Sequence, residues 1–310
     1  MTFKQKKELF DQNNPVTESR LVQFIGVDGY DVYNCSIPFE WCGVKYIYGR
    51  VERRNEWARS WVRLFKETAP DEFTLVVDSM IYQLEDPYIS IISGEMVMGG
   101  THVQYRRGEI SSLFGYFYKG TNLEDLRYFT TGPANMKDIR LVQLKDGIGV
   151  FSRPRSSEIE KEHGSGSIVG FAVIPDIMEL SADIIDGAKK IDDMFDDGEW
   201  GGCNQCYLLD SGLIGIIGHK SYKDSGLSVY VNVSFVFDPK AHKLLDERII
   251  ATRKSYPPGP AKYPYLSDCV FTSGIVMRPD GTADLYSGLG DTMVGRAVIE
   301  YPFEGFGAIV

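Results

Sequence analysis

One pattern recurs five times along the chain and constrains the fold more than any other feature: two short apolar runs joined by a tight turn that contains a glycine. The turn glycines are Gly43, Gly94, Gly147, Gly212 and Gly281. Successive glycines are 51, 53, 65 and 69 residues apart. Apolar runs joined in this way are typical of β-hairpins. A degenerate repeat of this length indicates four-stranded units stacked around an axis. The repeat therefore predicts an all-β fold, a five-bladed β-propeller.

The repeats place most of the chain in one domain. We expect residues 20–310 to form a single propeller and the polar residues 1–19 to form an N-terminal extension. Residues 181–195 depart from the β pattern, because their apolar side chains recur at helical spacing after Ser181, a favourable N-cap. We predict one short extra helix there, outside the ring.

Composition narrows the choice of partner and location. The net charge of −10 opposes binding to nucleic acid or to an anionic membrane, so we expect neither as a partner. No apolar run reaches the roughly 18 residues needed to span a bilayer. The basic N-terminus lacks the apolar region of a signal peptide, and we expect a cytoplasmic location. A homo-oligomer stays open.

Motifs for metals and cofactors are sparse. Cys203 and Cys206 form one half of a zinc ribbon without a second half, so we expect no metal site and buried free thiols instead. Phosphate-binding glycine loops and the GxSxG motif of serine hydrolases are also missing from the sequence. We therefore expect no cofactor.

Polar residues flank the five turns at similar offsets. Those before the glycines are Asn34, Asp86, Asp138, Asn204 and, less regularly, Asp268. Those after them are Arg50, Thr101, His102, Arg153, His219 and Asp291. Residues equally far from a hairpin turn lie at the same end of the hairpin. We therefore predict that these side chains converge on one polar funnel.

Such a funnel suits a polyhydroxylated substrate, an oligosaccharide. Glycosyl chemistry requires a carboxylic acid that protonates the leaving oxygen, together with either a carboxylate base or an external nucleophile. The candidates for acid and base are Asp86, Asp138, Asp291, Glu52 and Glu85.

Five segments, in order, resemble glycoside hydrolase family 130. They are NCSIPFEWCGVKYIYGRVE, LEDPYISII, MKDIRLVQLKDGIGVFSRP, GGCNQCYLLDSGLIGIIGHK and CVFTSGIVMRPDGTADLYSGLGDTMVGRA, and the resemblance spans about residues 30–300. Among the relatives of that family, the chain is most similar to a side branch, domain family 1861. The resemblance implies a five-bladed propeller and an inverting β-mannoside phosphorylase or hydrolase that acts on β-linked manno-oligosaccharides or similar glycans.

The resemblance also implies roles for particular residues. Asp86 would be the proton donor, with Glu52 or Asp138 as a base if water is the nucleophile. If inorganic phosphate is the co-substrate, it would be bound by Lys137, Arg153 and His219. For substrate binding we expect Asn34, Arg50, Asn204 and Asp291.

Four positions depart from the family pattern, and one of them is Cys35, which follows Asn34 where the family has proline. Tyr88 stands where the family has arginine, and Gly218 and Lys220 flank His219 where the family has tyrosine and glycine. Lys220 is a candidate to replace the lost positive charge. These departures leave the choice between phosphate and water open. They also leave an alternative from another class, a non-catalytic propeller that binds a glycan or a protein.

Overall fold

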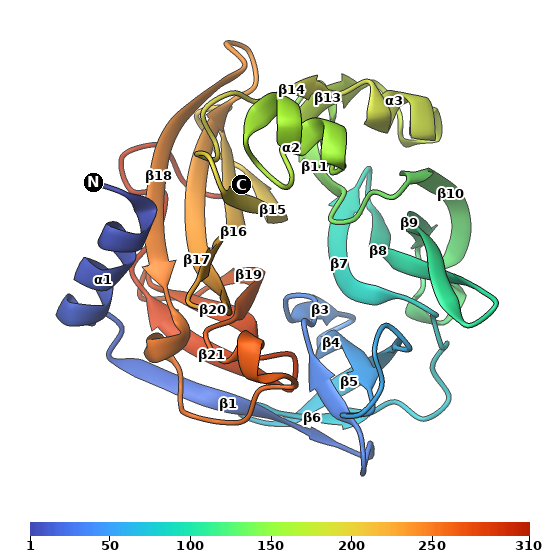
Figure 1. Cartoon of the computed structure of the whole chain (residues 1–310). Coiled ribbons are helices and arrows are strands. Elements are labelled where there is room, and N and C mark those ends of the chain that lie inside the picture. The colour runs from blue at the N-terminus through green and yellow to red at the C-terminus, as the bar shows by residue number, and fades with distance from the viewer.

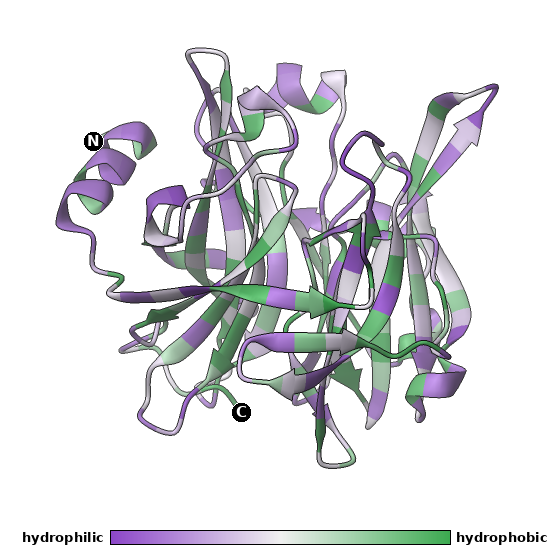
Figure 2. Cartoon of the chain, turned by 90° about the horizontal axis from the view of Figure 1, so that it is seen from below, coloured by the Kyte–Doolittle hydropathy of each residue, from purple (hydrophilic) through white to green (hydrophobic).

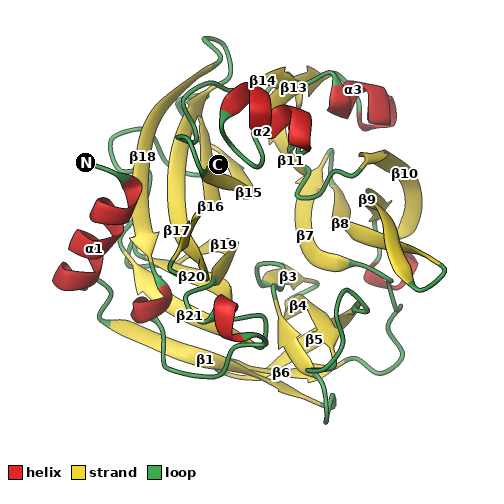
Figure 3. Ribbon diagram, in the orientation of Figure 1, coloured by secondary structure: helices red, strands yellow, loops and turns green.

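The computed structural model describes residues 1–310 and is built almost entirely of β-strands. The strands form curled sheets arranged around a common centre (Figure 1). The chain carries little helix, and its N-terminal helix lies outside the ring of sheets (Figure 3). The predicted all-β class is thus confirmed.

The largest sheet has nine strands, in the order β19-β20-β21-β1-β6-β5-β4-β2, with β3 paired to β4. Its strands are β1 (Glu18–Ile25), β2 (Asp31–Tyr33), β3 (Phe39–Trp41), β4 (Val44–Glu52), β5 (Trp61–Ala69), β6 (Glu72–Leu75), β19 (Val270–Met277), β20 (Ala283–Leu289) and β21 (Met293–Ile299). Strand β1 pairs antiparallel with β21 and parallel with β6. It therefore joins the first and last units of the chain into one hydrogen-bonded sheet.

Three further sheets have four antiparallel strands each, in the orders β10-β9-β8-β7, β11-β12-β13-β14 and β15-β16-β17-β18. Their strands are β7 (Glu85–Ile92), β8 (Glu95–Arg106), β9 (Glu109–Gly120), β10 (Arg127–Ala134), β11 (Arg140–Leu144), β12 (Gly147–Ser152), β13 (Gly170–Ile174), β14 (Lys189–Lys190), β15 (Glu199–Leu208), β16 (Ile214–Asp224), β17 (Leu227–Asp238) and β18 (Lys243–Ala251). The strands therefore form four hydrogen-bonded sheets, and the division into five blades stays a prediction.

All five predicted hairpins are present. They are β3–β4, β7–β8, β11–β12, β15–β16 and β19–β20. Each predicted turn glycine has a positive φ, between +74° and +123°. Glycine populates this region without steric cost, which explains its recurrence at the turns.

The apolar core lies between neighbouring sheets. One cluster joins Tyr88 and Ile92 on β7 to Leu141 and Val150 on β11 and β12. Apolar and polar residues alternate along the strands (Figure 2), as expected where one face of a strand is buried. Because the apolar faces meet between sheets, the ends of the strands that surround the centre are free to carry polar groups.

The helix predicted over residues 181–195 is wrong in its length. Helix α3 covers only Ala182–Asp186. It ends at Gly187, whose N–H donates to the carbonyl of Asp183, and β14 follows directly. The apolar residues Ile191 and Met194 are still buried, but they lie in turns beyond the helix. The spacing of these buried residues resembles that of a helix, although the residues after Asp186 make separate contacts with the core.

Two further helices are present, α1 (Phe3–Asn13) and α2 (Ser157–His163). The short 3-10 helices are η1 (Leu123–Asp125), η2 (Ile177–Glu179), η3 (Arg253–Ser255) and η4 (Pro264–Leu266). Helix α1 belongs to the predicted N-terminal extension, yet Phe3 is buried in the core beside β16 and β17. No helix has both the length and the apolar character needed to cross a membrane.

Candidate active site

A cavity of about 490 Å³ opens at the centre of the strand arrangement. Residues from all five hairpin units line it, among them eight of the ten predicted site residues. These eight are Asn34, Arg50, Asp86, Lys137, Asp138, Arg153, His219 and Asp291. Polar side chains from all five units thus meet in one cavity, whereas Asn204, Thr101, His102 and Asp268 do not line it.

Four of these residues share an unusual backbone conformation. Asn34, Asp86, Asp138 and Asp291 all have left-handed backbone conformations, with φ between +45° and +56°. Asparagine and aspartate enter this region more readily than other residues with a side chain. At Asp86 the pairing of β7 with β8 also shifts register, between Glu85 and Tyr88. A local shift of this kind redirects a side chain out of the regular alternation.

Arg50 organises the acidic side of the cavity. Its Nη1 donates to Oδ1 of Asp86 at 2.8 Å and its Nη2 to Oε1 of Glu85 at 2.9 Å. Its Nε donates to Ser60 at 2.8 Å, and Lys137 donates to the other oxygen of Glu85 at 3.0 Å. Glu85 is thereby held between two cations. Asp86 keeps its second oxygen, Oδ2, free of any partner within the protein.

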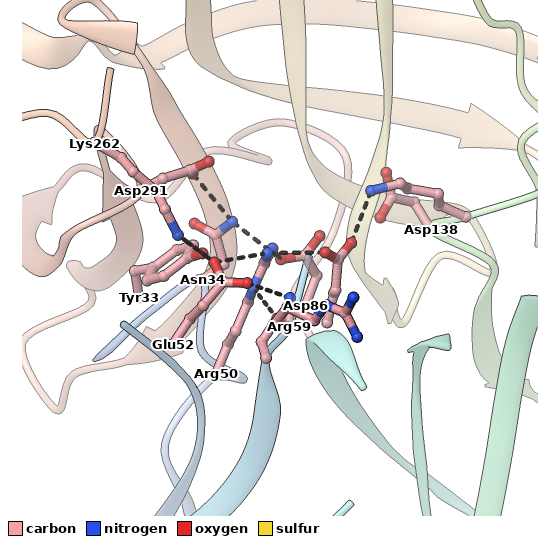
Figure 4. A network of polar contacts seen from close by, with 12 residues as sticks. Tyr33, Asn34, Arg50, Glu52, Arg59, Asp86, Asp138, Lys262 and Asp291 are labelled. Carbon is pink, nitrogen blue, oxygen red and sulfur yellow. Dashed lines mark hydrogen bonds and ion pairs between the residues drawn. The ribbon is translucent and has the colours of Figure 1, made fainter. Parts of the chain in front are cut away.

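Asn34 links the two carboxyl groups nearest the centre (Figure 4). Its Nδ2 donates to Asp86 at 3.0 Å and to Asp291 at 3.5 Å. The close approach requires Gly288 on β20, because a Cβ there would lie 1.9 Å from Oδ1 of Asn34. Burial raises the pKa of Asp291 to about 6; the charge of Asp86 adds to this rise and Arg50 opposes it. Asp291 therefore carries a proton for part of the time near neutral pH.

This raised pKa predicts a pH-dependent cost in stability. The folded state holds the Asp291 proton up to about pH 6, whereas the unfolded chain releases it near pH 4. The free energy of unfolding should therefore fall as pH rises through that window, by about 1–3 kcal/mol. Asp291→Asn should remove this loss, so that urea unfolding shows the variant gaining on the wild type between pH 4.5 and pH 7. Parallel pH curves for the two proteins would contradict the assignment.

Positive groups gather on the opposite side of the cavity. Arg153 donates from Nη1 to Asp138 at 2.7 Å and from Nε to the carbonyl of Gly201 at 2.5 Å. Burial alone would raise the pKa of Asp138, but Arg153 and Arg140 outweigh it and lower that pKa to about 2. Asp138 is therefore a permanently ionised partner of these arginines and a poor proton acceptor.

His219 is buried beside Arg153. Burial, reinforced by the charge of Arg153, lowers the pKa of His219 to about 3, so the ring is neutral. Its Nδ1 lies 2.7 Å from Oδ1 of Asn204. The ring stacks on Tyr230 with 5.5 Å between ring centroids. Its other nitrogen, Nε2, has no partner within the protein and can bond a ligand.

Arg155 and Lys223 complete the positive side at the mouth of the cavity. Both line the cavity and are exposed, and neither forms an ion pair with a carboxylate. Lys223 donates to the hydroxyl of Ser228 at 2.5 Å. In a chain with a net charge of −10, two unpaired cations beside Arg153 make this end of the cavity a site for an anion.

Two predicted site residues lie behind the cavity wall. Asn204 contacts His219 and so orients the ring. Glu52 is fully buried and accepts hydrogen bonds from Tyr33 at 2.5 Å and from the backbone N–H of Arg59 at 2.6 Å. It also forms an ion pair with Lys262, whose side chain is fully buried as well. Neither Asn204 nor Glu52 lines the cavity.

Three of the four departures from the family pattern can be placed in the structure. Tyr88 is buried in the core, and the guanidinium of Arg140 lies over its ring at 4.5 Å, so a cation from β11 occupies this region. Gly218 is required because a Cβ there would lie 2.4 Å from the carbonyl of Gly202. The expectation that Lys220 replaces the lost charge is wrong, since its ammonium is paired with Glu199 and Glu247 outside the cavity.

Three of the polar residues that flank the turns do not line the cavity. Asp268 forms an ion pair with Lys7 of α1 at 3.0 Å. His102 contacts the carbonyl of Gln83 and stacks on Tyr116, and Thr101 is buried. Offset from a turn fixes the end of the hairpin, but not the face of the sheet on which a side chain lies.

Several lining residues were not predicted as site residues from the sequence. They are Trp57, Arg155, Trp200, Lys223, Tyr230 and Phe271. Arg155 carried a usable signal, because it follows Arg153 at the two-residue spacing that places side chains on one face. Trp57 lies in an irregular segment between β4 and β5, where no periodicity operates.

The sequence matches, over residues 8–305, the family described as "Protein of unknown function (DUF1861)". A mannose phosphorylase from Leishmania mexicana, in complex with a phosphate ion, is 52% identical over 99% of this chain and 95% of that chain, with a TM-score of 0.93. A GDP-Man-dependent mannosyltransferase from the same organism is 46% identical over 100% of this chain and 97% of that chain, with a TM-score of 0.92. A glycosyl hydrolase from Bacteroides ovatus is 16% identical over 95% and 96% of the two chains and shares the fold alone, with a TM-score of 0.62. No curated protein matches this chain.

Proposed function

This chain belongs to the DUF1861 family, and we propose that it is a mannoside phosphorylase, which cleaves a β-linked manno-oligosaccharide with inorganic phosphate. One observation carries the proposal. The cavity places a cation-rich end opposite its carboxyl groups, where a phosphate ion can be held. A mannose phosphorylase in complex with a phosphate ion, 52% identical to this chain, supports the same interpretation.

The missing base distinguishes phosphate from water as the nucleophile. A water molecule must lose a proton to a carboxylate in an inverting hydrolase, whose two carboxyl groups are roughly 6.5–9.5 Å apart. Asp138 has a pKa of about 2, and Glu52 is fully buried behind the wall. Asp291 is joined to Asp86 by the single amide of Asn34, with bonds of 3.5 and 3.0 Å, so both carboxyl groups lie on the same side of the cavity. Phosphate needs no base, because it arrives ionised.

The proposed step is a single displacement. A phosphate oxygen attacks C1 of the terminal mannosyl unit while the bond from C1 to the glycosidic oxygen breaks. The leaving oxygen takes a proton, so that the products are mannose 1-phosphate of inverted configuration and a shortened oligosaccharide. Lys137, Arg153 and His219 hold the phosphate, with Arg155 at the entrance.

We assign the proton donation to Asp86. Its Oδ2 is the carboxyl oxygen without a protein partner, and its Oδ1 is fixed by Arg50 and Asn34. Asp291 is the neighbouring carboxyl group that retains a proton near neutral pH, and it shares the amide of Asn34 with Asp86. Asn34, Arg50 and Asp291 bind sugar hydroxyl groups beside the reacting bond, and Asn204 acts through His219.

We also propose that the chain is a five-bladed propeller related to glycoside hydrolase family 130. In this interpretation the nine-stranded sheet is two blades joined through β1. The five hairpins each supply the two innermost strands of a blade. The clustering of Asp86, Lys137 and Arg153 around one cavity supports the relationship.

A second candidate function is mannosyl transfer from GDP-mannose. The GDP-Man-dependent relative, 46% identical to this chain, favours it, as do the unpaired cations Arg155 and Lys223 at the mouth of the cavity. In that case the positive end would hold a diphosphate rather than inorganic phosphate. The non-catalytic alternative predicted from the sequence has no comparable support.

The direct test is incubation with β-1,2-, β-1,3- and β-1,4-linked mannobioses, with and without phosphate, and separately with GDP-mannose plus each disaccharide. We expect sugar release that depends on phosphate for at least one linkage. Equal release without phosphate would indicate a hydrolase. Elongation with GDP-mannose alone would favour the transferase, and no reaction in any arm would restore the binding alternative.

A further inference from the structure

Three aromatic rings form a row at the mouth of the cavity. Trp57 packs edge-on against Tyr263, with 5.6 Å between ring centroids, and Tyr263 stacks on Tyr265 at 5.5 Å with an angle of 3° between the planes. Trp57 is 47% exposed and Tyr265 is 40% exposed, and both line the cavity. Large aromatic side chains are normally buried, so two exposed rings beside a polar cavity require an explanation.

Hydrogen bonds from neighbouring strands and turns hold both segments that carry the row. Tyr105 donates to the carbonyls of Trp57 and Ala58, both at 2.9 Å. On the other side, Lys262 donates its backbone N–H to the carbonyl of Gly290 at 2.7 Å. Both segments are therefore fixed to strands or turns that also carry the cavity.

Glu52 connects the two aromatic segments. One of its oxygens accepts a hydrogen bond from the N–H of Arg59, two residues after Trp57, and the other forms the ion pair with Lys262, one residue before Tyr263. The same carboxylate lies 3.6 Å from Nη2 of Arg50, which holds Asp86 (Figure 4). A single buried carboxylate thus fixes the position of the aromatic row relative to the acidic side of the cavity.

We propose that Trp57, Tyr263 and Tyr265 form an outer binding site for the sugar rings of the oligosaccharide that follow the cleaved unit. The proposal rests on the proposed function, since it assumes that the terminal mannosyl unit of the oligosaccharide is bound in the cavity. The C–H face of a pyranose is apolar and flat enough to pack on an aromatic ring, while its hydroxyl groups stay in water. Rigid rings at low conformational cost suit such contacts. Glu52 is a positioning residue of this site.

The site predicts that affinity grows with chain length. Calorimetric titration without phosphate should show tighter binding of β-linked mannotetraose than of mannobiose by the wild type. Trp57→Ala should lower the affinity for the tetraose about tenfold more than that for the biose, which corresponds to about 1.4 kcal/mol. Trp57→Phe should recover most of the loss, because it restores an aromatic face.

A matched control is Tyr128→Ala on β10, since Tyr128 is 53% exposed but lies outside this cavity. It should leave both affinities unchanged. Equal losses for both sugars in Trp57→Ala, or no dependence of wild-type affinity on length, would overturn the outer site. If Trp57→Ala lowered the affinity for GDP but not for the longer sugars, the rings would instead be assigned to binding a nucleotide base. Binding needs no turnover, so a failure of phosphorolysis would reject the proposed function and leave this result standing.

Discussion

Asp86→Asn is expected to lower kcat/KM for a β-mannobiose by about 10²–10⁴-fold, the usual contribution of a positioned proton donor. Asparagine keeps the shape of the side chain and tolerates the left-handed backbone found at this position. Arg50 retains its bond to Glu85 at 2.9 Å, so the cavity should keep its form. Steady-state kinetics in saturating phosphate, with circular dichroism to confirm folding, measure the effect.

The leaving group distinguishes a proton donor from a residue that only orients substrate. The aryl group of an aryl mannoside leaves as a stable phenolate and needs little protonation. Asp86→Asn should therefore impair cleavage of an aryl mannoside far less than cleavage of the disaccharide. Asp71→Asn is the matched control, because Asp71 also has a positive φ of 61° and bonds Arg296 at 2.6 Å, but lies outside the cavity. It should keep full activity. Equal losses on both substrates for Asp86→Asn, or a larger selective loss for Asp291→Asn, would move the donor role away from Asp86.

Glu52→Gln is expected to destabilise the fold by about 3–5 kcal/mol, the typical cost of breaking a buried ion pair by removing one partner. Both side chains of the Glu52–Lys262 pair are fully buried, so the ammonium of Lys262 would stay in the interior without its counter-charge. Guanidinium unfolding measures the loss. The result also tests the sequence-based prediction that Glu52 is a catalytic base, which would instead lower kcat at unchanged stability.

Two further variants sharpen this test. Glu52→Gln combined with Lys262→Met removes the unpaired charge, so the double variant should be more stable than the sum of the single losses predicts. Glu67→Gln breaks the exposed pair with Lys45 and should cost no more than about 1 kcal/mol. A loss in Glu52→Gln as small as that in Glu67→Gln would contradict the assignment of Glu52 as a buried support of the site.

The hairpin repeat was predictable from the sequence because it rests on local chemistry. A turn glycine with a positive φ leaves a mark at a single position, and Gly43 and Gly281 were found by it. The convergence of Asp86 and Arg153 followed from the repeat, since equal offsets from a turn place residues at one end of a hairpin.

What the sequence could not show depends on contacts between units. Glu52 lies on β4 beside site residues, yet Lys262, more than two hundred positions away, turns it toward the interior. Asp268 is drawn outward by Lys7 of α1. The helix after Ser181 was overestimated because buried residues in consecutive turns imitate helical spacing. Trp57 and Tyr263 meet only after the ring of strands is assembled.

The central claim is that phosphate is the nucleophile at the cation-rich end of the cavity. Phosphorus NMR of a reaction containing enzyme, inorganic phosphate and the cleaved β-mannoside tests it most directly. We expect loss of the inorganic phosphate signal and growth of an α-mannose 1-phosphate signal, in equal amount to the shortened sugar that is released. Release of free mannose with the phosphate signal unchanged would contradict it.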